Sequence, residues 1–174
     1  IHYYWDIEDV HPLWDSMQKP TLWKFPEHTE GFADVAARHE NWNILVETGA
    51  DYTTTKAREE MEQILAEHKD IDVLVSQNDD MTFGALDALE DAGITTGVDG
   101  DVTVISFDAV KSALELVQAG KINVDIECNP EQGPYIEDVI RMLENGETLE
   151  SNYYVPEKIF TQENVGQYIN DRSY

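Results

Sequence analysis

Polar side chains that could hold a small molecule recur in this sequence directly after short apolar runs. The clearest case lies within Asp70–Phe83, where the apolar run 73–75 ends in Ser-Gln-Asn-Asp-Asp and a helical pattern follows. Carboxyl ends of parallel strands meet at one edge of a sheet, and ligands bind there. The four predicted junctions of this kind offer Asp51 and Tyr52; Asn78, Asp79 and Asp80; Asp108; and Glu127 and Asn129.

The chemistry of these junctions suits a neutral polyol. Carboxylates and a carboxamide form hydrogen bonds with hydroxyl groups, and the ring of Tyr52 offers an apolar face to C–H groups. An anion would need Lys, Arg or a glycine-rich helix entrance, and these turns contain neither. A structural alternative stays open, because Asn78 or Asp79 could do no more than cap the helix that follows.

An enzyme is not predicted. Asp79, Asp108 and Glu127 could converge for acid–base chemistry, but no nucleophile accompanies them, and GxGxxG, GxxxxGK[ST] and GxSxG are all missing. The lone Cys128 cannot build a zinc site. The histidines fit no metal spacing; they are His2, His11, His28, His39 and His68. The sequence therefore predicts a binding protein that uses neither a metal nor a cofactor.

Alternating strand and helix patterns must position these junctions. Strands are predicted at 21–25, 42–47, 73–75, 101–106, 122–127 and 153–159. Helices are predicted at 27–38, 54–68, 81–92, around Val110–Val117, around Ile136–Leu143 and at 162–170. This alternation predicts an α/β fold with a right-handed, doubly wound parallel sheet flanked by helices.

The chain divides into three predicted segments. Residues 1–27 hold three of the four tryptophans and three prolines, a composition that predicts an irregular, aromatic-rich segment packed against the adjoining domain. Residues 28–150 are predicted to form the α/β binding lobe. Residues 151–174 are predicted to form a return strand and a terminal helix.

Charge and composition limit the partners. Eleven Lys and Arg against 36 Asp and Glu give a net charge of -25, which argues against nucleic acid and anionic membranes as partners. One cysteine excludes an internal disulfide. No run reaches the length of a transmembrane helix, and the first residues lack the pattern of a signal peptide, so the signal of an exported protein would be absent from this chain.

Several longer motifs identify a family. DIDVLVSQNDDMTFGALDALEDAGI, DVTVISFDAVKSALELVQAGKINVDIECNP and GADYTTTKAREEME resemble the sugar-binding subunits of ABC importers, the type I periplasmic binding proteins. Within that family the chain is most similar to galactofuranose and galactose binders, over roughly residues 29–174. The resemblance implies the second lobe of that fold. It also implies capture of a monosaccharide, galactose-like, galactofuranose-like or a pentose, and its delivery to a membrane permease.

The resemblance also implies roles for single residues. Tyr52 matches the aromatic side chain that packs on the sugar ring, while Asn78, Asp108 and Glu127 match the polar ligand contacts. Asp79 is a weaker candidate, for which a capping or hinge role is favoured. His28 occupies the place where the family usually has an arginine. The implied location is periplasmic or extracellular, and a lipid anchor in a full-length precursor is compatible with it.

Departures from the family lead to one further expectation. Residues 1–27 match nothing in the family, and most of its first lobe is missing, so half of the cleft is expected to be exposed. This unpaired face is expected to be apolar, and an exposed apolar face predicts self-association.

Two other interpretations of the function stay open. The effector-sensing domain of a sugar-responsive transcription regulator shares this fold, but nothing basic precedes the lobe here. A flavodoxin-like enzyme would need a phosphate-binding turn that the sequence lacks.

Overall fold

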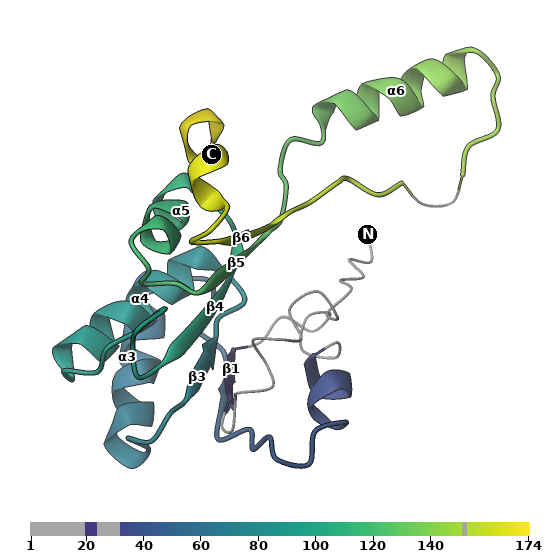
Figure 1. Cartoon of the computed structure of the whole chain (residues 1–174). Helices are drawn as coiled ribbons and strands as arrows, with labels where there is room; N and C mark the ends of the chain where they lie inside the picture. Colours follow the sequence, from purple (N-terminus) through teal and green to yellow (C-terminus); the bar gives the residue numbers. More distant parts are fainter. Residues whose placement is uncertain (1–19, 24–31, 151–152) are drawn as a thin grey trace.

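The computed structural model describes residues 20–23, 32–150 and 153–174, and its centre is one mixed sheet (Figure 1). The strand order is β2-β1-β3-β4-β5-β6. The first five strands of this order are mutually parallel, and β6 runs antiparallel to β5. The strands are β1 (Pro20–Trp23), β2 (Glu47–Thr48), β3 (Val73–Val75), β4 (Thr103–Asp108), β5 (Val124–Glu127) and β6 (Ile159–Thr161).

Helices cover both faces of this sheet, which confirms the predicted α/β architecture. The helices α3, α4 and α5 lie together on one face, and helical residues 32–36 lie on the other (Figure 1). Two short 3-10 turns, η2 and η3, follow β6. The bounds are α3 (Thr54–Glu67), α4 (Asp79–Asp91), α5 (Lys111–Gln118), α6 (Gly133–Glu144), η2 (Val165–Gln167) and η3 (Ile169–Asp171).

Strand alternation divides the core into two layers. Leu74 and Val104 point toward α3, α4 and α5, while Val75 and Ile105 point to the opposite face, where Phe32 packs. Burial of apolar side chains on both faces is the expected pattern for central parallel strands. Helical spacing in the sequence predicts an inward face for α3, α4 and α5, and most residues of these faces are buried; they are Ala57, Met61, Ile64, Leu65, Met81, Ala85, Ala88, Leu89, Ala113, Leu114 and Val117. Ala92 at the end of α4 was predicted to face inward but is exposed, and Val110 is only half-buried.

Helices α3 and α4 approach each other at Gly84, and this contact yields a prediction. A Cβ atom at Gly84 would lie 2.0 Å from the backbone oxygen of Thr54 and 2.9 Å from the backbone nitrogen of Arg58. Gly84→Ala is therefore expected to lower the free energy of unfolding by about 1–3 kcal/mol, measured by denaturant titration. Gly133→Ala is the control, because a Cβ there meets nothing within 4 Å. Equal stability of the two variants would contradict the close approach.

Several predicted boundaries are wrong. The strand expected at 42–47 shrinks to β2, because its register with β1 gives only the pairs Leu22–Glu47 and Trp23–Thr48. The strand expected at 153–159 begins only at Ile159, where antiparallel pairing with β5 becomes possible. The terminal helix expected at 162–170 is replaced by η2 and η3, so only single turns form there. Of the strand expected at 21–25, residues 21–23 lie in β1 and 24–25 lie outside the described residues.

Helix α6 stands apart from the sheet, at the end of a long excursion between β5 and β6 (Figure 1). It has the predicted apolar row, but none of its residues is buried. Ile136, Ile140 and Leu143 keep 56%, 50% and 58% of their surface exposed.

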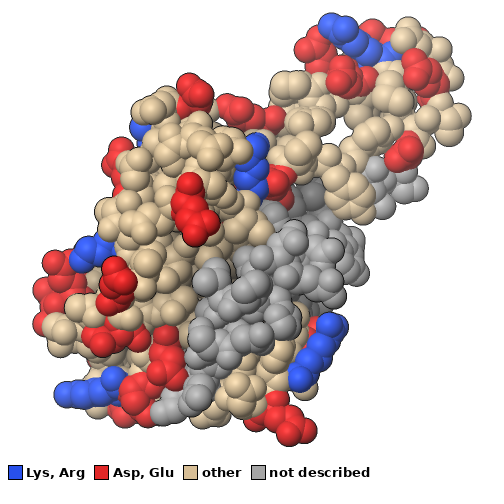
Figure 2. All heavy atoms as spheres, viewed as in Figure 1, with Lys and Arg blue, Asp and Glu red and all other residues tan. Residues whose placement is uncertain are grey.

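No helix in the described part of the chain has both the length and the apolar character needed to cross a membrane. Acidic side chains are scattered over the visible face, with few basic ones between them (Figure 2).

Candidate functional site

The turn between β3 and α4 places the first group of the candidate site. Buried Val73–Val75 forms β3, and the next residues, Ser76 and Gln77, are buried too. Asn78 has extended backbone angles and caps α4, because its Oδ1 accepts a hydrogen bond of 3.2 Å from the backbone N–H of Met81. The capping alternative for Asn78 is thus observed, but it uses only the oxygen of the side-chain amide.

The nitrogen of that amide connects two junctions that are distant in sequence. Asn78 Nδ2 donates a hydrogen bond of 2.5 Å to Asp108 Oδ2, across 30 residues of chain. Asp108 is the last residue of β4, and it pairs in register with Glu127, the last residue of β5. The parallel sheet therefore brings Asn78, Asp108 and Glu127 to neighbouring strand ends, at its carboxyl edge, as the sequence predicted.

The turn after β4 is held in an unfavourable backbone conformation. Asp108 and Ala109 both have positive φ angles, 108° and 61°, a region that residues other than glycine rarely adopt. Such strain often occurs where a turn must aim a functional side chain. Asp108 is half-buried, and burial is the main cause that raises the pKa of its carboxyl, while the hydrogen bond from Asn78 opposes the rise.

Asp79 points away from this edge and into the lobe. Its Oδ1 accepts a hydrogen bond of 2.5 Å from Ser106 Oγ, and its Oδ2 accepts one of 2.8 Å from the backbone N–H of Val110. Burial raises the pKa of Asp79 to about 7, although these two hydrogen bonds lower it. Through these two hydrogen bonds the carboxylate holds the start of α5 against β4. Its role in the structure is therefore to stabilise the turn, as a capping residue would.

A second buried carboxyl, which the sequence analysis did not single out, lies beside it. Asp125 of β5 pairs in register with Ser106 of β4 and is fully buried. Neither of its carboxyl oxygens has a hydrogen-bond partner among the described residues. Burial, together with the nearby charges of Asp79 and Asp108, raises the pKa of Asp125 well above the usual range. One signal was available in the sequence, since Asp125 lies between apolar residues within a predicted buried strand.

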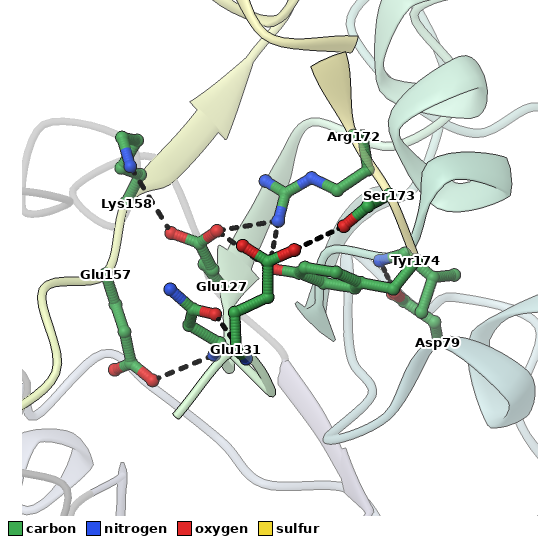
Figure 3. A network of polar contacts seen from close by, with 10 residues as sticks. Asp79, Glu127, Glu131, Glu157, Lys158, Arg172, Ser173 and Tyr174 are labelled. Carbon is green, nitrogen blue, oxygen red and sulfur yellow. Dashed lines mark hydrogen bonds and ion pairs between the residues drawn. The ribbon is translucent and has the colours of Figure 1, made fainter. Parts of the chain in front are cut away.

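Glu127 is held by the end of the chain (Figure 3). Its Oε1 accepts hydrogen bonds of 2.6 Å from Arg172 Nη1 and 2.8 Å from the Tyr174 hydroxyl. Its Oε2 faces Lys158 Nζ at 3.8 Å. Sequence reasoning missed Arg172 and Tyr174, because they lie 45 and 47 residues from Glu127 and belong to no recognisable motif.

Tyr52 lies at the same edge of the sheet, but not on a strand next to this group. Tyr52 follows β2 in the left-handed region, with φ of 59°, and half of its surface is exposed. In the sheet order β1 lies between β2 and β3, so Tyr52 is at the same edge as Asn78 but two strands away. The prediction for His28 lies outside the described residues.

The arrangement offers hydrogen-bonding groups to a small polar molecule. Asp108 and Glu127 provide carboxylate oxygens, Asn78 an amide, and Tyr52 a half-exposed ring. No group of three or more His, Cys, Asp or Glu suited to a metal ion occurs in the ranges 32–150 and 153–174.

Comparison with known proteins identifies the family and the fold. Residues 17–146 match the model of the periplasmic binding protein domain. The chain is 34% identical over 134 residues to a ribose import binding protein of Salmonella typhimurium, which covers 76% of this chain and 43% of that protein. It is 28% identical over 154 residues to a galactofuranose-binding protein of Escherichia coli, which covers 80% of this chain and 48% of the relative. The chain thus spans about half the length of these curated relatives.

A solved structure extends the likeness to the fold. A Mycobacterium smegmatis protein in complex with β-D-fucofuranose superimposes with a TM-score of 0.83 and 26% identity, over 96% of this chain and 58% of that one. The two curated relatives named above are binding proteins for ribose and galactofuranose. By the extent of the domain match and the identity to its relatives, this chain belongs to the periplasmic binding protein family.

Proposed function

We propose that this chain is the sugar-binding lobe of a solute-binding protein that captures a monosaccharide outside the cell and delivers it to an ABC permease. The observation that carries the proposal is the Asn78–Asp108 hydrogen bond of 2.5 Å beside Glu127, at the carboxyl edge of the sheet. A carboxamide oriented by a carboxylate presents donors and acceptors in a fixed arrangement, which suits neighbouring hydroxyl groups.

The ligand class follows from the chemistry of the edge and from the relatives. Polar groups of Asn78, Asp108 and Glu127 would receive the hydroxyl groups, while the ring of Tyr52 would cover C–H groups. Relatives of the chain are named for ribose and galactofuranose, and one solved relative holds fucofuranose. A pentose or a furanose form of a hexose is therefore the proposed ligand. Asp79 is proposed to support the site and not to touch the sugar.

Partner and location are proposed on the same basis. Curated relatives carry the name of import binding proteins, and the matching model is that of a periplasmic binding protein domain. A periplasmic or extracellular location and a membrane permease as acceptor of the sugar fit these names. Catalysis has no part in the proposal, because hydrogen bonding alone accounts for the residues at the edge.

A calorimetric titration tests the proposal. The protein is titrated with ribose, arabinose, galactose, xylose and glucose, and one pentose or furanose-forming hexose is expected to bind with a one-to-one stoichiometry. Xylitol, an open-chain polyol, serves as the control for non-specific hydroxyl binding. Heats indistinguishable from dilution for all five sugars would refute the proposed ligand class for this chain.

Helix α6 leads to the proposal of self-association. The side chains of its apolar row, Ile136, Ile140 and Leu143, are about half exposed. An exposed apolar row favours association with another protein surface. In a purified sample that surface belongs to a second copy of this chain. Sedimentation velocity is expected to show a concentration-dependent oligomer for the wild type and a monomer for Ile140→Glu. Asp138→Asn, on the exposed side of α6 opposite the apolar row, is the control and should behave like the wild type. A wild-type monomer at the highest concentration would contradict the proposal.

A further inference from the structure

The carboxylate of Glu127 is nearly inaccessible to water, and its two oxygens have different surroundings. Glu127 is 3% exposed at the end of β5. Its Oε1 receives two hydrogen bonds, from Arg172 and from Tyr174 (Figure 3). A buried carboxylate needs such partners, because removing a charge from water is costly unless it is paired and hydrogen-bonded.

The other oxygen, Oε2, is buried and lacks a hydrogen-bond donor among the described residues. The ammonium group of Lys158 lies 3.8 Å from Oε2, on a side chain that is about half exposed. Buried acceptors without a donor are uncommon in native proteins, and a missing ligand is one physical reason for such an exception. A hydroxyl donor from a sugar would satisfy Oε2 once it displaced the atoms that cover this oxygen.

The chain end that holds Oε1 is itself fixed from several sides. The backbone oxygen of Tyr174 accepts a hydrogen bond of 2.7 Å from the backbone N–H of Lys111, the first residue of α5. Ser173 Oγ donates a hydrogen bond of 2.5 Å to Glu131 Oε1. These contacts tie residues 173–174 to α5 and to the segment after β5, so the last residues are part of the lobe and not a loose tail.

Arg172 is equally constrained. Its side chain is 7% exposed, and its guanidinium lies 4.8 Å from the centre of the Phe160 ring and 4.5 Å from that of Tyr174. It also contacts the Tyr174 hydroxyl. Burial and the hydrogen bond to Glu127 raise the pKa of Tyr174, so this hydroxyl remains a donor at neutral pH. The guanidinium thus lies close to both rings, and its Nη1 donates a hydrogen bond to Oε1 of Glu127.

We infer that Arg172 and Tyr174 are positioning residues of the proposed sugar site, which occupy Oε1 of Glu127 so that Oε2 alone accepts a hydrogen bond from one hydroxyl of the sugar. This inference rests on the proposed function and adds a selectivity element to it. Because Oε2 has a fixed position, it favours sugars that carry a hydroxyl at the matching carbon and configuration. Epimers and deoxy analogues at that carbon leave the buried oxygen unsatisfied.

The test is a calorimetric series with the sugar that binds the wild type and with its monodeoxy analogues. In the wild type one deoxy position is expected to cost the most affinity. Arg172→Gln is expected to lower the affinity for the parent sugar about 10- to 100-fold, as for the loss of a charge-assisted hydrogen bond. The same variant should reduce the penalty at that one deoxy position, because Oε2 is no longer held in place.

Two further variants and a control make the series decisive. Tyr174→Phe removes the hydroxyl that donates a hydrogen bond to Oε1 of Glu127. It is expected to weaken sugar binding about 3- to 10-fold and to leave folding largely unaffected. Arg172→Lys should restore part of the affinity lost in Arg172→Gln. Ser173→Ala is the matched control, since it alters the same chain end through Glu131 and leaves Glu127 untouched. It should bind every sugar like the wild type.

Three results would count against the inference. Wild-type affinity and deoxy pattern in both Arg172→Gln and Tyr174→Phe would refute it while the proposed function stands. A uniform loss across all analogues, with the deoxy pattern kept, would assign the chain end a role in folding only and would also refute it. Failure of every sugar to bind the wild type would overturn the proposed function and the inference with it.

Discussion

Replacing Asp125 by asparagine is expected to make the protein more stable at neutral pH and to flatten the dependence of its stability on pH. Asp125 is fully buried, and both of its carboxyl oxygens lack a hydrogen-bond partner among the described residues. The nearby carboxylate of Asp79 accepts hydrogen bonds from Ser106 and Val110 and cannot donate one. A proton on Asp125 resolves this conflict, because the protonated group becomes a donor toward Asp79.

The direction of the pH dependence follows from proton binding in the two states. In the folded protein the pKa of Asp125 is raised well above its usual range and that of Asp79 is raised to about 7, so the folded state holds more protons than the unfolded state above pH ~4. The free energy of unfolding is therefore highest at acidic pH and falls as the pH rises through about 7. Between pH 5 and 8 the free energy of unfolding is expected to fall by about 2–4 kcal/mol. Each extra proton bound by the folded state lowers it by up to about 1.4 kcal/mol per pH unit.

Asparagine removes the need for that proton. Its amide N–H donates to Asp79 at any pH, so Asp125→Asn is expected to gain about 2 kcal/mol or more over the wild type at pH 8 and little at pH 5. Urea titrations at both pH values measure this. Asp99→Asn is the control, because it removes the same charge from an exposed position and should change stability little at either pH. A wild-type stability that rises from pH 5 to 8 would contradict the shared-proton account.

The second large effect is expected on ligand affinity when the Asn78–Asp108 pair is broken. Asp108→Ala removes a half-buried carboxylate and leaves the amide of Asn78 without the acceptor that now lies 2.5 Å away. Asn78→Ser keeps an oxygen that can cap α4 but removes the amide donor. Each variant is expected to lower the affinity for the bound sugar by about 100-fold or more, since charge-assisted hydrogen bonds are lost together with the orientation of their neighbours.

The control for this pair lies in the same acidic turn. Asp80 is exposed, so Asp80→Asn removes one charge beside the site without removing a buried contact. Calorimetry should give wild-type affinity for this variant, and melting temperatures should show that Asn78→Ser remains folded. Equal weakening in Asp80→Asn and Asp108→Ala would mean that the general negative charge, and not the Asn78–Asp108 geometry, determines binding.

Local patterns in the sequence were sufficient for the central elements. The run Val73–Val75 followed by a polar turn and a helical stripe predicted β3, the cap at Asn78 and the inward face of α4. The edge of a parallel sheet then explains why Asn78, Asp108 and Glu127 come together. Each of these inferences depends on residues close in sequence or on the repeated direction of parallel strands.

Features that depend on distant partners were not predictable in this way. The position of β6 depends on antiparallel pairing with β5, and the chain end reaches Glu127 from 45 residues away. The buried pair Asp79–Asp125 depends on β4 and β5 lying in register, so that Ser106 and Asp125 are neighbours. The apolar row of α6 was predicted correctly, but its position away from the sheet follows from the long excursion between β5 and β6 and not from its own sequence.

The most direct test of the central claim is an NMR titration of the ¹⁵N-labelled protein with the monosaccharide panel. The account predicts that one sugar produces saturable shifts of backbone amides, concentrated at residues 51–53, 77–79, 107–109 and 126–128. Amides of α6 should stay unchanged in the same experiment, since that helix stands away from the strand ends. Saturable shifts that avoid these four junctions, or no saturable shift with any sugar, would contradict the claim that this edge of the sheet binds a monosaccharide.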